Sequence, residues 1–427
     1  MSSKKILCKN DIESLNAIAD EFKLLDRFST DLESPEKRKL VIGSLGLFTS
    51  GAAVGIGITN ISNRPQEVRW KYVSFTHQQG ESNTKKSQNP ILAEAMPRLA
   101  DLLNQMTEGK FTIEPHTAKN LESSDSHLDL INNKTVDCGI AGIYFSQTKR
   151  GLYFGTGIPF GLNPEEQTAW LAHKRESKDK TFMEEVYEKY GYGNILPIPL
   201  IATGHQMGGF FPKEINGSKD LSGITMRIPG LGGNVLRAMN EKFCFYGGCG
   251  GLEENKPIHA IDIPELMNNK KIHAFEFTGP HDDYRILQSI TIPIRDKLIY
   301  HYPGWWEPGT TFELQINRQS WDALGESYQS ILRAACAQIY KQTLAEYNIE
   351  NSKKLVMISE ESRGIKFKRF DDLFLKEAEE ATEKLLDDYA KKIGAEKDRE
   401  NFKFAYDEWK IFKKRVRAWS NFNFQNK

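Results

Sequence analysis

Arg227 lies in the stretch of the chain that is best suited to hold an anion. Residues 225–233 are Thr-Met-Arg-Ile-Pro-Gly-Leu-Gly-Gly, which predicts a buried strand end, a tight turn and a helix from Asn234. A glycine-rich turn that opens a helix directs N–H groups and the positive end of the helix dipole toward one point. The guanidinium of Arg227 could reach that point and bind a carboxylate or phosphate through two parallel hydrogen bonds. The alternative is a structural turn whose arginine pairs with a nearby acid.

Acidic residues near the end of the predicted strand 272–277 could supply oxygen ligands to a cation. Glu276 interrupts the apolar run of this strand. Because a buried carboxylate is costly unless it is paired or bound to a metal, Glu276 either forms a salt bridge with Arg227 or ligates a metal ion. Asp282 and Asp283 follow closely and could add oxygen ligands or cap a helix.

Three further residues are candidates for the wall of a binding site. Gln206 lies in the glycine-rich run 204–209, where its amide either approaches a ligand or ion, or bonds to the backbone at a strand edge. Tyr144 follows a predicted strand and could offer a hydroxyl group. Glu307 lies in the aromatic stretch 302–310 between two Pro-Gly turns, which suits a cleft wall or a hinge. It is either a ligand contact or an exposed loop acid.

The pattern from Val68 onward predicts how these residues are positioned. Short apolar runs alternate with amphipathic segments, which is typical of a parallel sheet with crossover helices. Ligands of such sheets bind beyond the carboxyl ends of the strands, where Tyr144 is expected. The predicted strands cover 68–75, 110–113, 136–143, 195–202 and 272–277, and the predicted helices begin at Pro90 and cover 128–133 and 319–347.

Two long helices are predicted to close the chain. In the first, apolar residues recur on one face from Phe374 to Tyr389, and Gly394 ends it. In the second, mostly aromatic residues recur at spacings of three and four from Phe402 to Trp419. Such a seam buries against something large, which is either the protein's own core or a second subunit.

The first part of the chain is predicted to lie outside the globular fold. Residues 1–37 are polar and charged, and basic residues then precede an uncharged, apolar, small-residue run at 40–58. This pattern predicts a signal sequence or a membrane anchor at 38–60. A polar linker at 61–67 leads into the globular part, 68–427.

Composition excludes several classes of function. The 427-residue chain has zero net charge and no long basic stripe, which argues against binding of nucleic acid. Its five cysteines fit no zinc pattern. Cys244 and Cys249 could form a disulfide in an oxidising compartment, whereas Cys138 and Cys336 are predicted to be free and buried. No nucleophile–base pair and no Gly-x-Ser-x-Gly elbow is present, so the sequence does not predict an enzyme.

Five motifs follow one another along the globular part. They are Ile158-Pro-Phe-Gly-Leu162, Gln206-Met-Gly-Gly209, Met226-Arg-Ile-Pro-Gly-Leu-Gly-Gly233, Glu276 before Gly279-Pro280, and Tyr302-Pro-Gly-Trp305 with Glu307-Pro-Gly-Thr310. Together they resemble the solute-binding subunit of the tripartite ATP-independent periplasmic (TRAP) transporters, in the branch that binds 2-oxo acids and related small carboxylates. The resemblance runs from about Trp70 to the C-terminus.

The resemblance implies a two-lobed α/β fold of the periplasmic-binding-protein type, with parallel-sheet lobes, a hinge cleft and long C-terminal helices. Lobe I would comprise about 68–200 and 289–320, lobe II about 201–288 and 321–365, and the C-terminal helices 366–427. Such a receptor works in the periplasm and delivers its ligand to membrane permease subunits. The C-terminal helices resemble those that some relatives exchange within a homodimer.

The resemblance also implies a binding site with a cation. The family's arginine, here Arg227, clamps the carboxylate of the substrate. A sodium or calcium ion lies beside it, and its ligands match the side chain of Gln206, the carboxylate of Glu276 and the main-chain carbonyl of Phe277. Ligands that are all oxygen suit such hard cations.

Further substrate contacts are implied at Tyr144, Glu307, Asp282 and Gln206. The chain departs from the family at 281–283, where His-Asp-Asp replaces a Tyr-Asn-Asp pattern. The added negative charge favours a divalent ion or a different acid.

Two other functions remain as alternatives. One is a metal-dependent enzyme that uses Glu276, Asp282 and His281 on a bound oxo acid, with the cation as Lewis acid. The other is a sensor domain that the apolar segment tethers to a membrane.

Overall fold

The computed structural model describes residues 67–75, 90–116, 124–145, 148–245, 258, 260–361 and 365–424. These residues belong to one compact unit, Pro65–Lys427. The predicted N-terminal extension, the signal sequence or anchor, most of the linker and Cys249 lie outside the described residues. No helix in the described part of the chain is long and apolar enough to cross a membrane.

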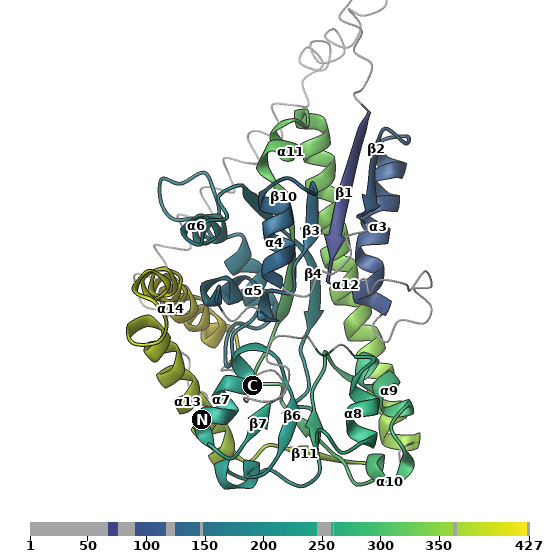
Figure 1. Ribbon diagram of the computed structural model, residues 1–427, viewed down its shortest axis with the longest axis vertical. Coiled ribbons are helices and arrows are strands. Elements are labelled where there is room, and N and C mark those ends of the chain that lie inside the picture. The colour runs from purple at the N-terminus through teal and green to yellow at the C-terminus, as the bar shows by residue number, and fades with distance from the viewer. Residues whose placement is uncertain are drawn as a thin grey trace, which may run out of the picture. The chain divides into compact units, whose positions relative to one another are not determined.

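The first sheet has the strand order β2-β1-β3-β10-β4 (Figure 1). β1 pairs in parallel with β2 and β3, but β10 runs antiparallel to β3 and β4, so the sheet is mixed rather than parallel throughout. β10 was not predicted, because all of its residues are buried and several are polar, so it shows neither alternation nor an apolar run. The strands are β1 (Val68–Ser74), β2 (Phe111–Pro115), β3 (Cys138–Ile140), β4 (Ile195–Gly204) and β10 (Thr310–Asn317).

The second sheet has the order β11-β9-β5-β8-β6-β7 and is also mixed. Two of its strands depart from the predicted boundaries. β9 lies here although 289–320 was assigned to lobe I, and β11 is a strand although 366 was expected to begin the helices. β9 and β11 pair in parallel, so backbone N–H and C=O groups of each strand bond to those of the other. The strands are β5 (Phe210–Phe211), β6 (Thr225–Arg227), β7 (Cys244–Phe245), β8 (Ala274–Phe275), β9 (Ile299–Tyr302) and β11 (Lys366–Arg369).

Helices cover both sheets, which confirms the α/β class. α12 packs against β4 and α3 beside the first sheet and against α9 beside the second, so one helix links the two (Figure 1). The α-helices are α3 (Pro90–Met106), α4 (Ser124–Asn132), α5 (Pro164–Leu171), α6 (Phe182–Lys189), α7 (Gly230–Met239), α8 (Ile263–Asn268), α9 (Pro280–Gln288), α10 (Ile292–Arg295), α11 (Arg318–Asp322), α12 (Glu326–Glu361), α13 (Asp372–Lys391) and α14 (Glu396–Phe424). Short 3-10 helices are η2 (Ile143–Phe145), η3 (Arg150–Gly155) and η4 (Ser218–Leu221).

From Phe402 to Phe412, the aromatic seam of α14 buries against the protein's own core, whereas Trp419 at its end is exposed. Phe402 and Trp409 lie with their ring centres 5.6 and 5.3 Å from that of Phe154 in η3. Phe412 lies 5.2 Å from Trp170 of α5. The C-terminal helices therefore belong to the same core as the elements around the first sheet.

The cysteines agree with the prediction where they are described. Cys138 and Cys336 are free and buried. Cys244 is disulfide-bonded. Its predicted partner, Cys249, lies outside the described residues, so that pairing stays a prediction.

β10 carries a buried polar network that links it to α6 and to the main chain at Ala141. Tyr187 of α6 donates a hydrogen bond to Glu313 at 3.0 Å, and Gln315 donates to the Tyr187 hydroxyl at 3.1 Å. Gln315 also accepts a bond of 2.9 Å from the main-chain N–H of Ala141, three residues before Tyr144. Burial raises the pKa of Glu313 to about 8, although the bond from Tyr187 lowers it.

Replacing Glu313 by Gln should make the free energy of unfolding less dependent on pH. The unfolded carboxyl loses its proton near pH 4 to 5, whereas the folded one keeps it up to about pH 8. The contribution of this neutral carboxyl to the free energy of unfolding is therefore fully present below about pH 4. It is lost as pH rises from there to about 8, by at most about 1.4 kcal/mol per pH unit. Urea unfolding of the full-length chain at about pH 5 and about pH 8 measures the difference. Equal losses in wild type and variant would contradict a neutral Glu313.

Candidate functional site

A small cavity of about 30 Å³ lies between the two sheets. Elements of the first sheet and of the second both contribute to its wall, and every predicted site residue except Asp282 lines it. The lining residues are Leu92, Tyr144, Thr203, Gln206, Arg227, Pro229, Glu276, Phe277, Thr278, Glu307, Thr310 and Phe312.

Arg227 ends β6, beside Phe275 of β8, and is buried. Its Nε and Nη2 donate to the main-chain carbonyl of Ile258 at 3.2 and 3.1 Å. Its Nη1 donates to the main-chain carbonyl and the carboxylate of Glu276 at 2.9 and 2.5 Å. The salt bridge that was one alternative for these two residues is therefore present. Of the five guanidinium N–H groups, one on Nη2 has no acceptor among the described residues. The prediction had required two parallel N–H groups to be available for an anion.

Of the glycines after Arg227, Gly230 adopts a positive φ of 62°, as the predicted turn requires, whereas Gly232 and Gly233 serve close packing. α7 begins at Gly230, not at Asn234 as predicted, so Gly232 and Gly233 lie in its first turn. A Cβ at Gly233 would stand 2.7 Å from the ring of Phe245 in β7. These residues thus bring the start of α7 against the sheet that carries Arg227.

Three buried carboxyl groups, those of Glu276, Glu307 and Asp283, lie near the single positive charge of Arg227. Burial raises the pKa of Glu276 to about 7, while Arg227 lowers it and Glu307 raises it. Burial also raises the pKa of Glu307, against hydrogen bonds from Thr310 and Gln206. The charge of Arg227 acts on Asp283 as well, whose pKa burial raises well above its usual range. A positive charge in the cavity would offset this excess.

The amide of Gln206 has its nitrogen satisfied and its oxygen not. Nε2 donates to Thr310 Oγ1 at 2.8 Å and to Glu307 Oε2 at 3.3 Å, and Thr310 donates to the same carboxylate at 2.7 Å. Gln206 Oε1 is buried and has no hydrogen-bond partner within the described residues. A buried acceptor without a partner is costly, and an amide oxygen is a ligand that hard cations accept.

Aromatic and apolar side chains form the rest of the wall. The ring of Tyr144 stands edge-on to Phe312 and to Phe75, with ring centres 5.9 Å apart in each pair. Leu92 of α3 and Pro229 add apolar surface. Burial raises the pKa of the Tyr144 hydroxyl, which is therefore neutral and able to donate at neutral pH.

Asp282 does not line the cavity, contrary to the predicted substrate contact. It lies in the first turn of α9 and points to α12, where the Tyr347 hydroxyl donates to it at 3.2 Å. Thr278, which does line the cavity, also bonds to Asp282. Burial raises the pKa of Asp282 to about 7, and these hydrogen bonds lower it. Asp282 thus acts on the wall through Thr278.

Three threonines of the wall were not predicted as site residues. Thr310 closes a recognised motif and Thr278 follows the predicted ligand Phe277, so both carried a signal. Thr203 lies near the end of β4 and shows nothing in the sequence that separates it from an ordinary strand residue.

The chain matches the family model of the bacterial extracellular solute-binding proteins, family 7, at residues 82–242 and 299–392. It is also similar to a monocarboxylate 2-oxoacid-binding periplasmic protein of Nostoc sp. strain PCC 7120. The two are 31% identical over 326 residues, which cover 76% of this chain and 81% of that protein.

Solved structures of TRAP transporter solute-binding proteins match 84% of this chain. The one from Bordetella bronchiseptica RB50 is 26% identical, with a TM-score of 0.67 over 96% of that chain, and is a dimer with copurified calcium and picolinate. The one from Pseudoalteromonas atlantica is 26% identical, with a TM-score of 0.66 over 98%, and holds sodium and pyruvate. The one from Colwellia psychrerythraea is 25% identical, with a TM-score of 0.64 over 97%, and holds calcium and pyruvate. The predicted two-lobed fold class is confirmed by these matches.

Proposed function

The chain belongs to family 7 of the bacterial extracellular solute-binding proteins, and we propose that it is the receptor of a TRAP-type transporter for a 2-oxo or 2-hydroxy acid bound together with a cation. The family consists of periplasmic binding proteins of transporters and not of enzymes. The receptor would deliver its ligand to a membrane permease. The segment 38–60 would export or anchor it, and the two sheets would form its two lobes, with β9 in lobe II.

One observation carries the cation part of the proposal. Gln206 Oε1 is buried without a hydrogen-bond partner in the described chain, beside carboxylates that share one guanidinium. Gln206 Oε1, the carboxylate of Glu276 and the main-chain carbonyl of Phe277 would hold the ion. A bound cation would supply positive charge next to the ligand's carboxylate. The same charge would balance Glu276 and Glu307.

Arg227 would take the carboxylate of the ligand. With Glu276 turned toward the cation, the Nη1 hydrogen that now bonds to its carboxylate becomes available. Arg227 then presents N–H groups on both terminal nitrogens, which matches the two oxygens of a carboxylate. Its contacts with the carbonyl of Ile258 hold the guanidinium in place during this exchange.

The remaining wall favours a small acid. The hydroxyl of Tyr144 can donate a hydrogen bond to an oxo or hydroxy oxygen, and the carboxylate of Glu307 can accept one from a hydroxy group. Leu92 and Phe312 offer apolar surface to a short alkyl group.

A thermal-shift screen of the full-length chain tests this function. The ligands are small 2-oxo and 2-hydroxy acids, each with sodium, calcium or a chelator. A ligand that binds only the native state raises the melting midpoint. A rise for one acid that requires a cation supports the proposal, whereas no rise for any acid under any condition contradicts it.

We infer that the C-terminal helices also join two copies of the chain. Ile411 and Trp419 of α14 are 61% and 66% exposed, although both side chains are large and apolar. A double change of Ile411 and Trp419 to Lys should shift the full-length chain from dimer to monomer in sedimentation. Ile292→Lys is the matched control, because Ile292 is 61% exposed on α10. A monomeric wild type, or a control that dissociates equally, would rule out this dimer.

A further inference from the structure

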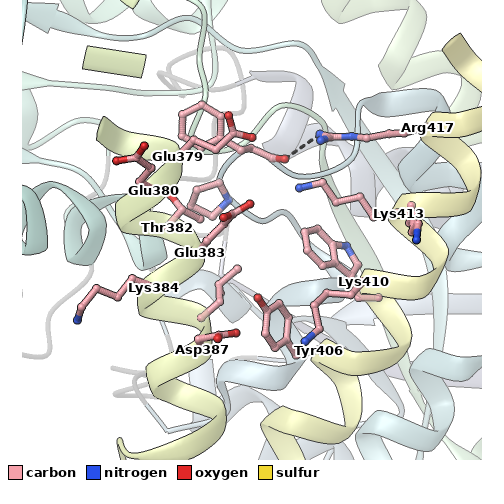
Figure 2. A pocket seen from close by; sticks show the side chains of 15 residues that line it. Glu379, Glu380, Thr382, Glu383, Lys384, Asp387, Tyr406, Lys410, Lys413 and Arg417 are labelled. Atoms are coloured by element: carbon pink, nitrogen blue, oxygen red, sulfur yellow. Dashed lines mark hydrogen bonds between the residues drawn. The ribbon is translucent and has the colours of Figure 1, made fainter. Parts of the chain in front are cut away.

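A groove of about 710 Å³ lies between α13 and α14 (Figure 2). Figure 2 shows mostly acidic side chains on α13 along one side, with Lys384 among them, and basic side chains on α14 along the other. Glu379, Glu380 and Glu383 belong to the acidic wall, and Lys410, Lys413 and Arg417 to the basic wall.

The two charged walls act on each other across the groove without direct pairing. Burial lowers the pKa of Lys413, but the charges of Glu379 and Glu383 raise it. No ion pair joins α13 to α14 among the described residues; lysines of α13 such as Lys391 pair with acids of α13, here Asp387 at 2.7 Å. Glu383 and Lys413 form no ion pair with any described residue. Lys410 pairs with Asp407 of its own helix at 3.2 Å, so Glu383 and Lys413 are the facing charges that the walls leave available on the two sides of the groove.

Aromatic rings support the basic wall and form the floor. The ammonium of Lys413 lies 4.9 Å from the ring centre of Trp409, and that of Lys410 lies 4.1 Å from the ring centre of Tyr406. Burial lowers the pKa of Lys413 to about 8, and the charge of Arg417 acts in the same direction. A partly desolvated ammonium of this kind gains from an acidic partner. The rings of Trp409 and Tyr406 are buried, so the half-buried ring of Phe160 is the aromatic surface that an apolar side chain could contact.

The floor of the groove is tied to the cleft between the sheets. Arg417 donates to the carbonyls of Phe160 and Gly161 at 2.8 and 2.9 Å. Phe160 lines the groove, stacks on Trp305 with ring centres 5.1 Å apart and donates its N–H to the Trp305 carbonyl at 2.7 Å. Trp305 stands two residues before Glu307 of the cleft wall. An occupant of the groove would therefore touch a segment that is bonded to the cleft.

We propose that this groove binds a polypeptide segment of a partner protein, with acidic side chains against α14, basic side chains against α13 and an apolar side chain on Phe160. A ligand of one sign would be repelled by one wall. The charged lining residues run from Glu379 to Asp387 and from Lys410 to Arg417, so the charged walls extend for about 10 to 12 Å. Such a length matches several residues of a chain, whereas a free zwitterion spans a single pair of charges. The site does not depend on which ligand the cleft binds.

Three synthetic helical peptides of equal length and with the same apolar stripe test the proposal. One carries Lys on one flank and Glu on the other, the second only Lys and the third only Glu. Fluorescence anisotropy with the full-length chain should show at least tenfold tighter binding of the mixed peptide. Lys413→Glu should weaken it at least tenfold. Lys397→Glu, a matched change at an exposed lysine of α14 outside the groove, should alter it less than twofold.

Several results would overturn this assignment. The assignment is wrong if the mixed peptide does not bind, or if a peptide with charges of one sign binds equally well or more tightly. It is also wrong if Lys413→Glu and Lys397→Glu weaken binding equally. Displacement of the mixed peptide by a free amino acid would assign the groove to a small zwitterion instead. The mixed peptide should bind Arg227→Met as it binds wild type, because Arg227 does not line the groove. Failure of the cleft proposal and failure of the groove proposal are thus separate outcomes.

Discussion

Replacement of Arg227 by Met should weaken the binding of pyruvate by about a hundredfold or more. The change removes the charged donors that would face the ligand's carboxylate, and hydrogen bonds to charged groups contribute about 1.5 to 3 kcal/mol each. Two such bonds correspond to a factor of about 100 or more in the dissociation constant. Calorimetric titration of the full-length chain at fixed calcium concentration measures the effect.

Two control variants separate binding from folding in this test. Arg227 also donates to Ile258 and Glu276, so its loss leaves a buried carboxylate without its partner and lowers stability. Arg227→Lys keeps the positive charge but loses the two parallel N–H donors of the guanidinium, and should bind pyruvate about tenfold more weakly than wild type. Arg295→Met removes an arginine that pairs with Asp296 outside the cleft, and should bind as wild type does. An Arg227→Met variant that unfolds cooperatively and keeps wild-type affinity would show that the ligand lies elsewhere.

Glu276→Gln should abolish the dependence of ligand binding on the cation. The variant keeps an oxygen of similar position but loses the negative charge, so cation affinity should fall by about thirtyfold or more. In the wild type, a proton competes with the ion for a carboxyl whose pKa is about 7 in the absence of an ion. Cation affinity of the wild type should therefore fall as pH drops below about 7, and that of the variant should not. Titrations of calcium at several pH values measure both effects.

The matched control for this change is Glu313→Gln, which alters another buried carboxyl that does not line the cleft. It should leave calcium affinity and its pH dependence as in the wild type. If Glu276→Gln retained the cation dependence, or if both variants lost it, the assignment of Glu276 as a ligand would be wrong.

Local sequence patterns predicted most of the cleft. Glycine-rich runs marked the segments of Arg227 and Gln206, and a lone carboxylate in an apolar strand marked Glu276. Each of these signals lies within a few residues of the side chain concerned, because it reflects a strand end, a close approach or the cost of a buried charge. The structure brings these segments to one cavity.

Features that depend on distant segments were not predicted. β10 is a buried strand with polar residues, and Glu313 within it is satisfied by Tyr187 of α6. Asp282 turns away from the cavity because α12 supplies Tyr347 as its partner. The salt bridge of Arg227 with Glu276 was one of the predicted alternatives, but the hydrogen bonds of Arg227 to the main-chain carbonyl of Ile258 were not predicted. In each case the decisive contact joins segments that no local pattern connects.

The most direct test of a shared site for acid and cation is their thermodynamic coupling. Calorimetry of the chelator-treated, full-length chain would measure calcium affinity with and without pyruvate, and pyruvate affinity with and without calcium. Because coupling between two ligands is reciprocal, each should raise the affinity of the other by the same factor, expected to be tenfold or more. Binding of pyruvate with the same affinity in calcium and in chelator would contradict a receptor that holds the two together.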